Sequence, residues 1–123
     1  MNIRDPKLVA LQFNEYINNQ DIEGLESLMT KDHIFIDRTG IQYGDMINGW
    51  KEFFTNYPTY RNYFNIVESR GNLVILLGYA KWYKDSLEKH YAIWTAKIKN
   101  NQVEIWQIYE DTDDNRSKLG LSY

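Results

Sequence analysis

Asp111 is the residue whose neighbours in the sequence best suit acid–base chemistry. It follows Tyr109 and Gln107, and residues two apart along a strand share one face. A carboxyl group among aromatic rings in an apolar pocket has a raised pKa, which lets it give or take a proton near neutral pH. We therefore predict that Asp111 is a catalytic acid/base and that Gln107 and Tyr109 orient a substrate oxygen. The alternative is structural: Asp111 caps a short helix, in competition with Asp113 or Asp114.

His33 and Asp37 form a second group that could move a proton. They lie four residues apart, so on a short strand they would share a face and could pair as a base and its orienting partner. Two ligands are too few for a metal site, and His90 is the only other imidazole in the chain. We predict that His33 and Asp37 assist catalysis and that no metal is bound. In the alternative, Asp37 only ends a strand and starts the turn at Gly40.

Arg38 and Arg116 are possible partners for Asp111 or for a carboxylate on a ligand. An ion pair between Arg116 and Asp111 would hold the pKa of that carboxyl down, so the group would stay ionised. It could then no longer donate a proton. A solvated position on the surface is the simpler expectation for both arginines.

Aromatic residues make up 15% of the chain, with 10 Tyr, 4 Trp and 5 Phe. Tyr and Trp join an apolar ring to one hydrogen-bonding group, which suits a cavity wall or an interface as well as a core. Strand alternation divides such rings between the two faces of a sheet, so some are predicted to form a homodimer interface on the outer face. If bulky residues filled the interior, no cavity would remain. The predicted ligand-binding residues are Tyr16, Trp50, Tyr57, Trp94, Gln107 and Tyr109.

Composition narrows the class of protein. A length of 123 residues, with 43% hydrophobic and 25% charged residues, predicts a single soluble domain over residues 1–123. The net charge is −3 and the basic residues are scattered, which disfavours nucleic acid as a partner. The chain has no Cys, so disulfides and thiol nucleophiles are excluded. No signal peptide and no stretch of roughly 20 apolar residues is present; we therefore expect a cytoplasmic protein without membrane spans.

The order of elements predicts an α+β fold. Asp5-Pro6 and Asp21 begin two helices, and a third runs from Asp45 to just before Pro58. Thr30 to Asp32 is predicted as a turn. The sheet should be mostly antiparallel and strongly curved, wrapped over the helical hairpin and the third helix so that a cone-shaped interior remains. Its predicted strands are 33–37, 60–70, 73–85, 89–99 and 103–110, and a short helix follows over 113–119.

Three segments resemble the nuclear transport factor 2-like superfamily, and within it the SnoaL-like polyketide cyclase group. They run from Phe13 to Asp37, from Gly44 to Pro58 and from Glu104 to Leu121. The first resembles the opening helical hairpin and strand, the second the helix at the mouth of the cone, and the third the closing strand with its Leu-Gly ending. The resemblance implies a cystatin-like or ketosteroid-isomerase-like roll.

The same resemblance implies roles for individual residues. In SnoaL-like cyclases an Asp on the last strand is the acid/base, and Asp111 matches it. In ketosteroid isomerases the base is an Asp at the end of the first strand, where Asp37 falls. Their oxyanion site needs a Tyr on the first helix and a protonated Asp on a late strand. Phe13 and Trp94 stand near those positions, which argues against steroid isomerisation by that mechanism.

The sequence thus leaves two functions open. One is a cofactor-free isomerase or cyclase that uses Asp111 on an apolar, oxygen-bearing small molecule. The other is a non-catalytic, homodimeric module that holds a hydrophobic ligand. Both predict a small-molecule partner and no cofactor; they differ in whether a carboxylate inside the cavity lies near a second titratable group.

Overall fold

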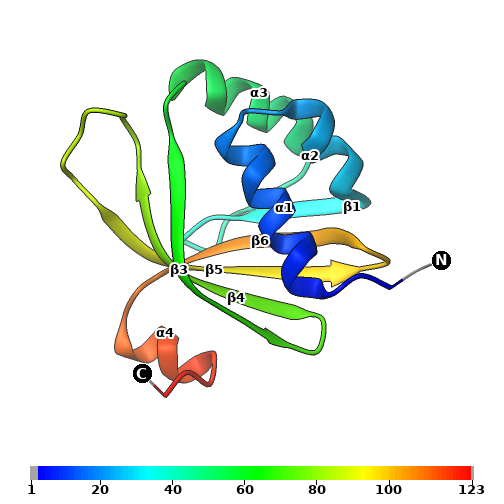
Figure 1. Cartoon of the computed structure of the whole chain (residues 1–123), viewed down its shortest axis with the longest axis vertical. Helices are drawn as coiled ribbons and strands as arrows, with labels where there is room; N and C mark the ends of the chain where they lie inside the picture. Colours follow the sequence, from blue (N-terminus) through cyan, green and yellow to red (C-terminus); the bar gives the residue numbers. More distant parts are fainter. Residues whose placement is uncertain (1–2, 123) are drawn as a thin grey trace.

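The computed structural model describes residues 3–122 and contains a six-stranded sheet with helices on both of its faces (Figure 1). The strand order is β2-β1-β6-β5-β4-β3. The strands are β1 (Met29–Ile36), β2 (Gln42–Tyr43), β3 (Arg61–Arg70), β4 (Leu73–Lys81), β5 (His90–Lys99) and β6 (Gln102–Glu110). The helices are α1 (Pro6–Asn18), α2 (Ile22–Leu28), α3 (Met46–Asn56) and α4 (Asp113–Lys118).

Neighbouring strands are antiparallel except for β1 and β6, which run parallel. Figure 1 shows α1, α2 and α3 on one side of the curved sheet and α4, with the C-terminal end, on the other. The predicted α+β class and mostly antiparallel sheet are therefore confirmed. Because the sheet curves over three helices, its concave face can enclose a site.

Side-chain caps start the first two helices as the sequence predicts. Asp5 accepts a hydrogen bond from the backbone N–H of Lys7 at 3.0 Å, and Asp21 accepts one from that of Gly24 at 2.9 Å. Each bond satisfies one of the helix-end donors that have no partner within the helix. The apolar face of α1 then buries Val9, Phe13 and Ile17 fully against the sheet.

Two strand boundaries differ from the prediction by more than one residue. The predicted turn at Thr30 to Asp32 is wrong, because α2 passes directly into β1 and these residues belong to the strand. A register irregularity between Met29 and Ile34 accommodates this entry into the sheet. β4 ends at Lys81 rather than Asp85. The two-residue strand β2 was not predicted, since it is too short for its alternation to be seen.

Strand alternation divides the sheet into two apolar faces, and both are covered. Val74, Leu76 and Trp94 belong to the cluster beneath α1 and α3. The alternating residues form a second cluster on the opposite face, where the chain after α4 packs over them. This outer cluster consists of Ile75, Leu77, Ile93 and Leu121, with Ile66, Leu73, Tyr109 and Leu119 against it. Tyr63, Tyr79 and Tyr91 continue the outer face across β3, β4 and β5 as paired neighbours.

Gly78 lets β3 and β4 approach each other where the register shifts between Phe64 and Ile66. A Cβ at Gly78 would overlap the carbonyl oxygen of Tyr63 and would lie 2.9 Å from the Cα of Phe64. Phe64 packs edge-on against Trp94, with ring centroids 5.0 Å apart. Glycine at this position therefore helps to place a ring of the concave face.

We predict that Gly78→Ala lowers the free energy of unfolding by at least about 2 kcal/mol, because backbone rather than a flexible side chain must move. Urea unfolding at constant m-value measures the change. Gly44→Ala is the matched control, since a Cβ there meets nothing within 4 Å; it should stay within about 0.5 kcal/mol of the parent. Equal stability of the two variants would show that the close approach at Gly78 is unimportant.

Candidate functional site

The main cavity lies between α3 and the concave face of the sheet and has a volume of about 320 Å³. Its lining comes from α3, from β1, β3, β5 and β6 and from the neighbouring loops, and Figure 1 shows α3 on the same side of the curved sheet as α1 and α2. The lining residues are Phe35, Asp37, Arg38, Tyr43, Met46, Gly49, Trp50, Phe53, Tyr60, Asn62, Trp82, Trp94, Trp106 and Ile108. Most of them are aromatic, so the cavity suits a flat, apolar molecule.

Aromatic contacts hold the walls in place. Trp50 stacks on Phe54 with ring centroids 5.5 Å apart and meets Phe53 edge-on at 5.8 Å. Phe53 in turn contacts Tyr60 at 4.8 Å and Trp82 at 5.6 Å. Offset and edge-on pairs of this kind add about 0.5–1.5 kcal/mol each beyond their buried area. Phe53 of α3 therefore contacts Trp82 in the loop after β4 and Tyr60 just before β3.

Asp37 is the carboxylate among the lining residues, and its oxygens already have partners. Oδ1 accepts hydrogen bonds from the Thr39 hydroxyl at 2.7 Å, the Thr39 N–H at 2.9 Å and the Ile41 N–H at 3.1 Å. Oδ2 accepts one from the Tyr43 hydroxyl at 2.9 Å. These bonds, led by that from the Thr39 side chain, lower the pKa of Asp37 to about 2. Asp37 thus stays ionised at neutral pH and holds a proton only weakly.

Tyr60 is buried in the lining, whereas Arg38 beside it is exposed. Burial raises the pKa of the Tyr60 hydroxyl, and the positive charge of Arg38 opposes that rise only in part. The hydroxyl is therefore protonated at physiological pH and can both donate and accept a hydrogen bond. Arg38 adds a permanent cation to this end of the cavity.

Three lining residues carry buried polar atoms without a hydrogen-bond partner in the described part of the chain. They are Trp50 Nε1, Trp94 Nε1 and Asn62 Oδ1. Each such atom costs about 1–3 kcal/mol relative to a paired one. These atoms are buried, so the open space of the cavity does not reach them as the side chains stand.

Asn62 is held firmly in this position. Its Nδ2 donates to Asn14 Oδ1 at 3.0 Å, its backbone N–H donates to Asn18 Oδ1 at 2.8 Å, and its carbonyl accepts from Asn18 Nδ2 at 3.0 Å. Asn62 is 3% exposed. Two asparagines of α1 thus fix the amide and leave only Oδ1 unpaired.

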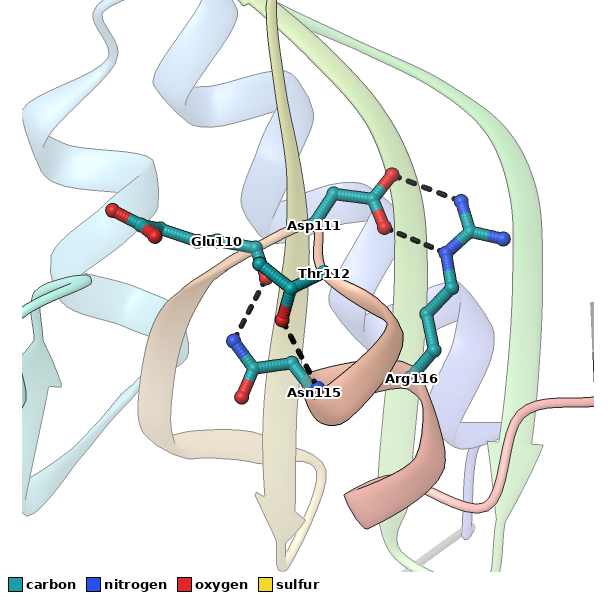
Figure 2. Close-up of polar contacts among 5 residues, drawn as sticks. All are labelled: Glu110, Asp111, Thr112, Asn115 and Arg116. Atoms are coloured by element: carbon teal, nitrogen blue, oxygen red, sulfur yellow. Dashed lines mark hydrogen bonds and ion pairs between the residues drawn. The ribbon is translucent and has the colours of Figure 1, made fainter.

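Asp111 occupies a different place. It pairs with Arg116 through two contacts, Nε to Oδ1 at 2.6 Å and Nη2 to Oδ2 at 2.9 Å (Figure 2). The hydrogen bond from Arg116 lowers the pKa of Asp111. The alternative prediction, that Asp111, Asp113 or Asp114 caps the short helix, is wrong. Thr112 caps α4 by accepting a hydrogen bond from the Asn115 N–H at 3.1 Å. Asp111 lines none of the three cavities found in the described residues.

His33 faces a second cavity, of about 310 Å³, between α2, β1 and the start of α3. Its Nδ1 lies 2.6 Å from the carbonyl oxygen of Val103, so Nδ1 carries the hydrogen and donates it. Burial lowers the pKa of His33, and the imidazole is therefore neutral near pH 7. The structure thus distributes the three predicted catalytic residues, His33, Asp37 and Asp111, over three separate environments.

Of the six predicted ligand-binding residues, Trp50 and Trp94 line the main cavity. Tyr16 instead packs over Gly24, and Tyr57 joins the rings of Phe53 and Trp82 without lining the cavity.

Gln107 and Tyr109 alternate with the lining residues Trp106 and Ile108 along β6. Tyr109 packs on the outer cluster. Alternation places Gln107 on the same face of β6 as Tyr109, and that face lies away from the cavity.

The sequence reasoning missed Tyr60 and Asn62 as cavity residues; for Arg38 it offered a ligand contact or a surface position, and Arg38 is an exposed residue of the lining. Asn62 gave a usable signal, because a polar amide at an inward position of a strand with aromatic neighbours is unusual in a core. Tyr60 was predicted to begin a strand, whereas β3 starts one residue later, at Arg61. Within residues 3–122, no group of three or more His, Asp or Glu side chains is arranged to hold a metal, and no helix is long and apolar enough to cross a membrane.

No protein-family model and no curated protein matches the sequence, whereas many solved structures share the fold. An NTF2-like protein of unknown function from Cytophaga hutchinsonii has a TM-score of 0.72 at 12% identity, covering 98% of this chain and 99% of that one. A candidate SnoaL-like polyketide cyclase from Shewanella putrefaciens has a TM-score of 0.74 at 15% identity, covering 97% and 88%. TerC, crystallised with polyporic acid, has a TM-score of 0.69 at 18% identity, covering 92% and 97%.

The ion pair of Asp111 yields a prediction on stability. Because its pKa is lowered in the folded state, the pair stabilises the fold above the ordinary carboxyl pKa, and the effect is lost as pH falls through the folded value. Asp111→Asn should cost about 0.5–1 kcal/mol at pH 7, and the cost should shrink towards acid pH. Urea unfolding as a function of pH measures it. A double-mutant cycle with Arg116→Gln serves as the control; zero coupling at pH 7 would show that the pair contributes nothing.

Proposed function

Because the chain has the fold of nuclear transport factor 2-like proteins, SnoaL-like cyclases among them, we propose that it binds an apolar, oxygen-bearing small molecule in the main cavity without a cofactor. The observation that carries this proposal is a cavity with mostly aromatic walls and a few polar side chains in its lining, among them Asp37, Arg38 and Tyr60. An apolar surface that holds a few fixed polar groups is the usual composition of a small-molecule site.

The size of the cavity limits the ligand. About 320 Å³ is near the lower end of the roughly 300–1,000 Å³ found for ligand sites. A compound of one or two fused rings suits such a volume. The fold relative TerC was crystallised with polyporic acid, and this supports a flat, oxygenated compound as the ligand class.

The protonation states and positions of the titratable groups favour ligand binding without catalysis. The lining carboxylate, Asp37, has a pKa of about 2, far from the neutral range in which an acid/base works best. Asp111 is ion-paired outside the cavity, and the neutral His33 faces another one. We therefore place the non-catalytic binding module first.

An isomerase or cyclase is the second candidate, and one observation favours it. Asp37 lies at the end of β1, on the cavity lining, and is ionised. A carboxylate there could take a proton from a carbon next to a carbonyl, while the electron pair moves onto the carbonyl oxygen. A catalytic role for Asp111 would first require its ion pair with Arg116 to open.

Filling the cavity tests the binding proposal. We expect 1-tetralone, a flat bicyclic ketone, to bind the parent chain, and Ile108→Phe to weaken binding at least tenfold because the larger ring takes up cavity space. Tyr109→Phe is the matched control. Tyr109 is the residue after Ile108 in β6 but packs on the outer cluster, so this variant should bind the ligand like the parent chain. Native mass spectrometry and quenching of tryptophan fluorescence measure binding. Unaltered affinity of Ile108→Phe would place the ligand elsewhere.

The same spectra test the proposed homodimer. The outer face carries the partly exposed rings of Tyr63 and Tyr91, which are 39% and 60% exposed, and aromatic side chains are frequent in the centres of interfaces. A mass of two chains at micromolar concentration is expected. A strict monomer would contradict the interface assigned to the outer face.

Hydrogen exchange separates binding from catalysis. In D₂O, a base in the cavity would accelerate replacement of the hydrogens beside the carbonyl of 1-tetralone, which ¹H NMR follows against a protein-free reference. If Asp37 is that base, Asp37→Asn abolishes the acceleration and Asp111→Asn retains it. The reverse pattern would assign the chemistry to Asp111. Binding without any acceleration, the outcome we expect, would leave a non-catalytic module.

A further inference from the structure

A third cavity, of about 300 Å³, lies between the C-terminal end of α1, the start of β3 and the loop after β4. Its lining contains three cationic residues, Arg61, Lys81 and Lys84, and no acidic one. We call these three residues the cationic group. The chain as a whole carries a net charge of −3, so this excess of positive charge is local. A concave surface lined by charges of one sign attracts ions of the opposite sign.

The cationic group has no acidic partner, unlike the lysines of β5. Lys97 lies 3.3 Å from one carboxylate oxygen of Glu104, and Lys99 lies 3.5 Å from the other. Within residues 3–122, no carboxylate forms an ion pair with any member of the cationic group. Arg61 instead lies over the ring of Tyr63, 5.7 Å from its centroid, and a neutral ring does not cancel its charge. The three charges are therefore available to a ligand.

Two members of the cationic group face each other directly across the sheet. Arg61 on β3 is the register partner of Lys81 on β4, so their side chains leave the same face, with Cβ atoms about 4.5–5.5 Å apart. Like charges in such a pair destabilise a sheet. Because no acidic side chain of the lining offsets this repulsion, an anion bound beside the two residues would relieve it.

Hydrogen bonds fix the backbone around the cavity and leave the charged side chains accessible. The Lys84 N–H donates to the Thr59 hydroxyl at 2.9 Å, and the Gln20 side chain donates to the Pro58 carbonyl. These bonds tie the segment before β3 to the loop after β4 and to the end of α1. The side chains of Arg61 and Lys84 are exposed, so a ligand can reach them without a change in the fold.

The number of cations favours a phosphate group over a carboxylate. A phosphate monoester carries about −1.5 to −2 charges near pH 7 and has three strong acceptor oxygens, whereas a carboxylate carries one charge on two oxygens. Arginine binds phosphate through two parallel N–H groups, and lysine acts as a point charge. Nucleic acid would need a longer basic surface than three residues provide.

We propose that this third cavity binds a phosphate group, as the free ion or as the monoester of a small molecule, through Arg61, Lys81 and Lys84. Tyr60 contributes to the lining of both this cavity and the main one, so the two sites are neighbours. The inference does not depend on the proposed function, because it concerns a different cavity and a different class of ligand.

Titration of the ¹⁵N-labelled full chain with inorganic phosphate, phenyl phosphate and benzoate tests the site by NMR. The ionic strength is held constant with sodium chloride at about pH 7.5, where phosphate is mostly doubly charged. Both phosphates should cause saturable shifts at the amides of residues 59–63 and 81–84. Benzoate should bind at least about tenfold more weakly, because it lacks one charge and one acceptor. Tighter binding of phenyl phosphate would indicate a monoester, and equal binding the free ion.

Lys81→Met and Lys84→Met each remove a charge and keep a side chain of similar length. Each should weaken phosphate binding about fivefold, the factor that one partly exposed charge pair supplies at most. Lys97→Met is the matched control, since Lys97 pairs with Glu104 on the same sheet, and its affinity should equal that of the parent. Equal weakening in all three variants, or shifts that never saturate, would show unspecific attraction to positive charge and overturn the inference.

Discussion

The alternation of side chains along β5 and β6 is the constraint on which the rest of the structure depends. Residues that face α3, such as Trp94, Trp106 and Ile108, build the cavity, while their neighbours Ile93 and Tyr109 face outward. Successive side chains of a strand point to opposite faces, so a shift of one residue would exchange the two sets. Such a shift is costly here because both faces are apolar and covered: α1 and α3 bury one, and the chain after α4 buries the other.

The same constraint explains the role of Asp111. It continues the outward series of Gln107 and Tyr109, so it leaves the sheet on the side where α4 packs. There Arg116, one turn into α4, meets both of its oxygens (Figure 2). The pair ties the end of β6 to the helix whose following residues, Leu119 and Leu121, close the outer cluster. The carboxylate of Asp111 therefore helps to hold α4 against the end of β6.

Much of the fold could be predicted from the sequence, whereas the site could be predicted only in part. The helix caps at Asp5 and Asp21 are local signals, and the structure begins α1 and α2 directly after them. Alternation also grouped Gln107 with Tyr109, but it cannot say which face of a sheet lies beneath the helices when both faces are apolar. That choice depends on tertiary packing, in particular on residues after α4 that cover the outer face. Tyr60 was predicted to begin a strand, but it lies just before β3, and its place in the cavity follows from the way the chain enters that strand.

The cavity joins two features that separate binding from catalysis in physical terms. Its one lining carboxylate in the described residues is stabilised as an anion by four hydrogen bonds, and a base so strongly stabilised gives little driving force for proton removal. The rest of the lining is mostly aromatic, and walls of this kind hold a flat molecule through buried apolar area, without a titrating group. Among the described lining residues, apolar contact area is therefore the main contribution to binding, and the one carboxylate is poorly suited to proton transfer.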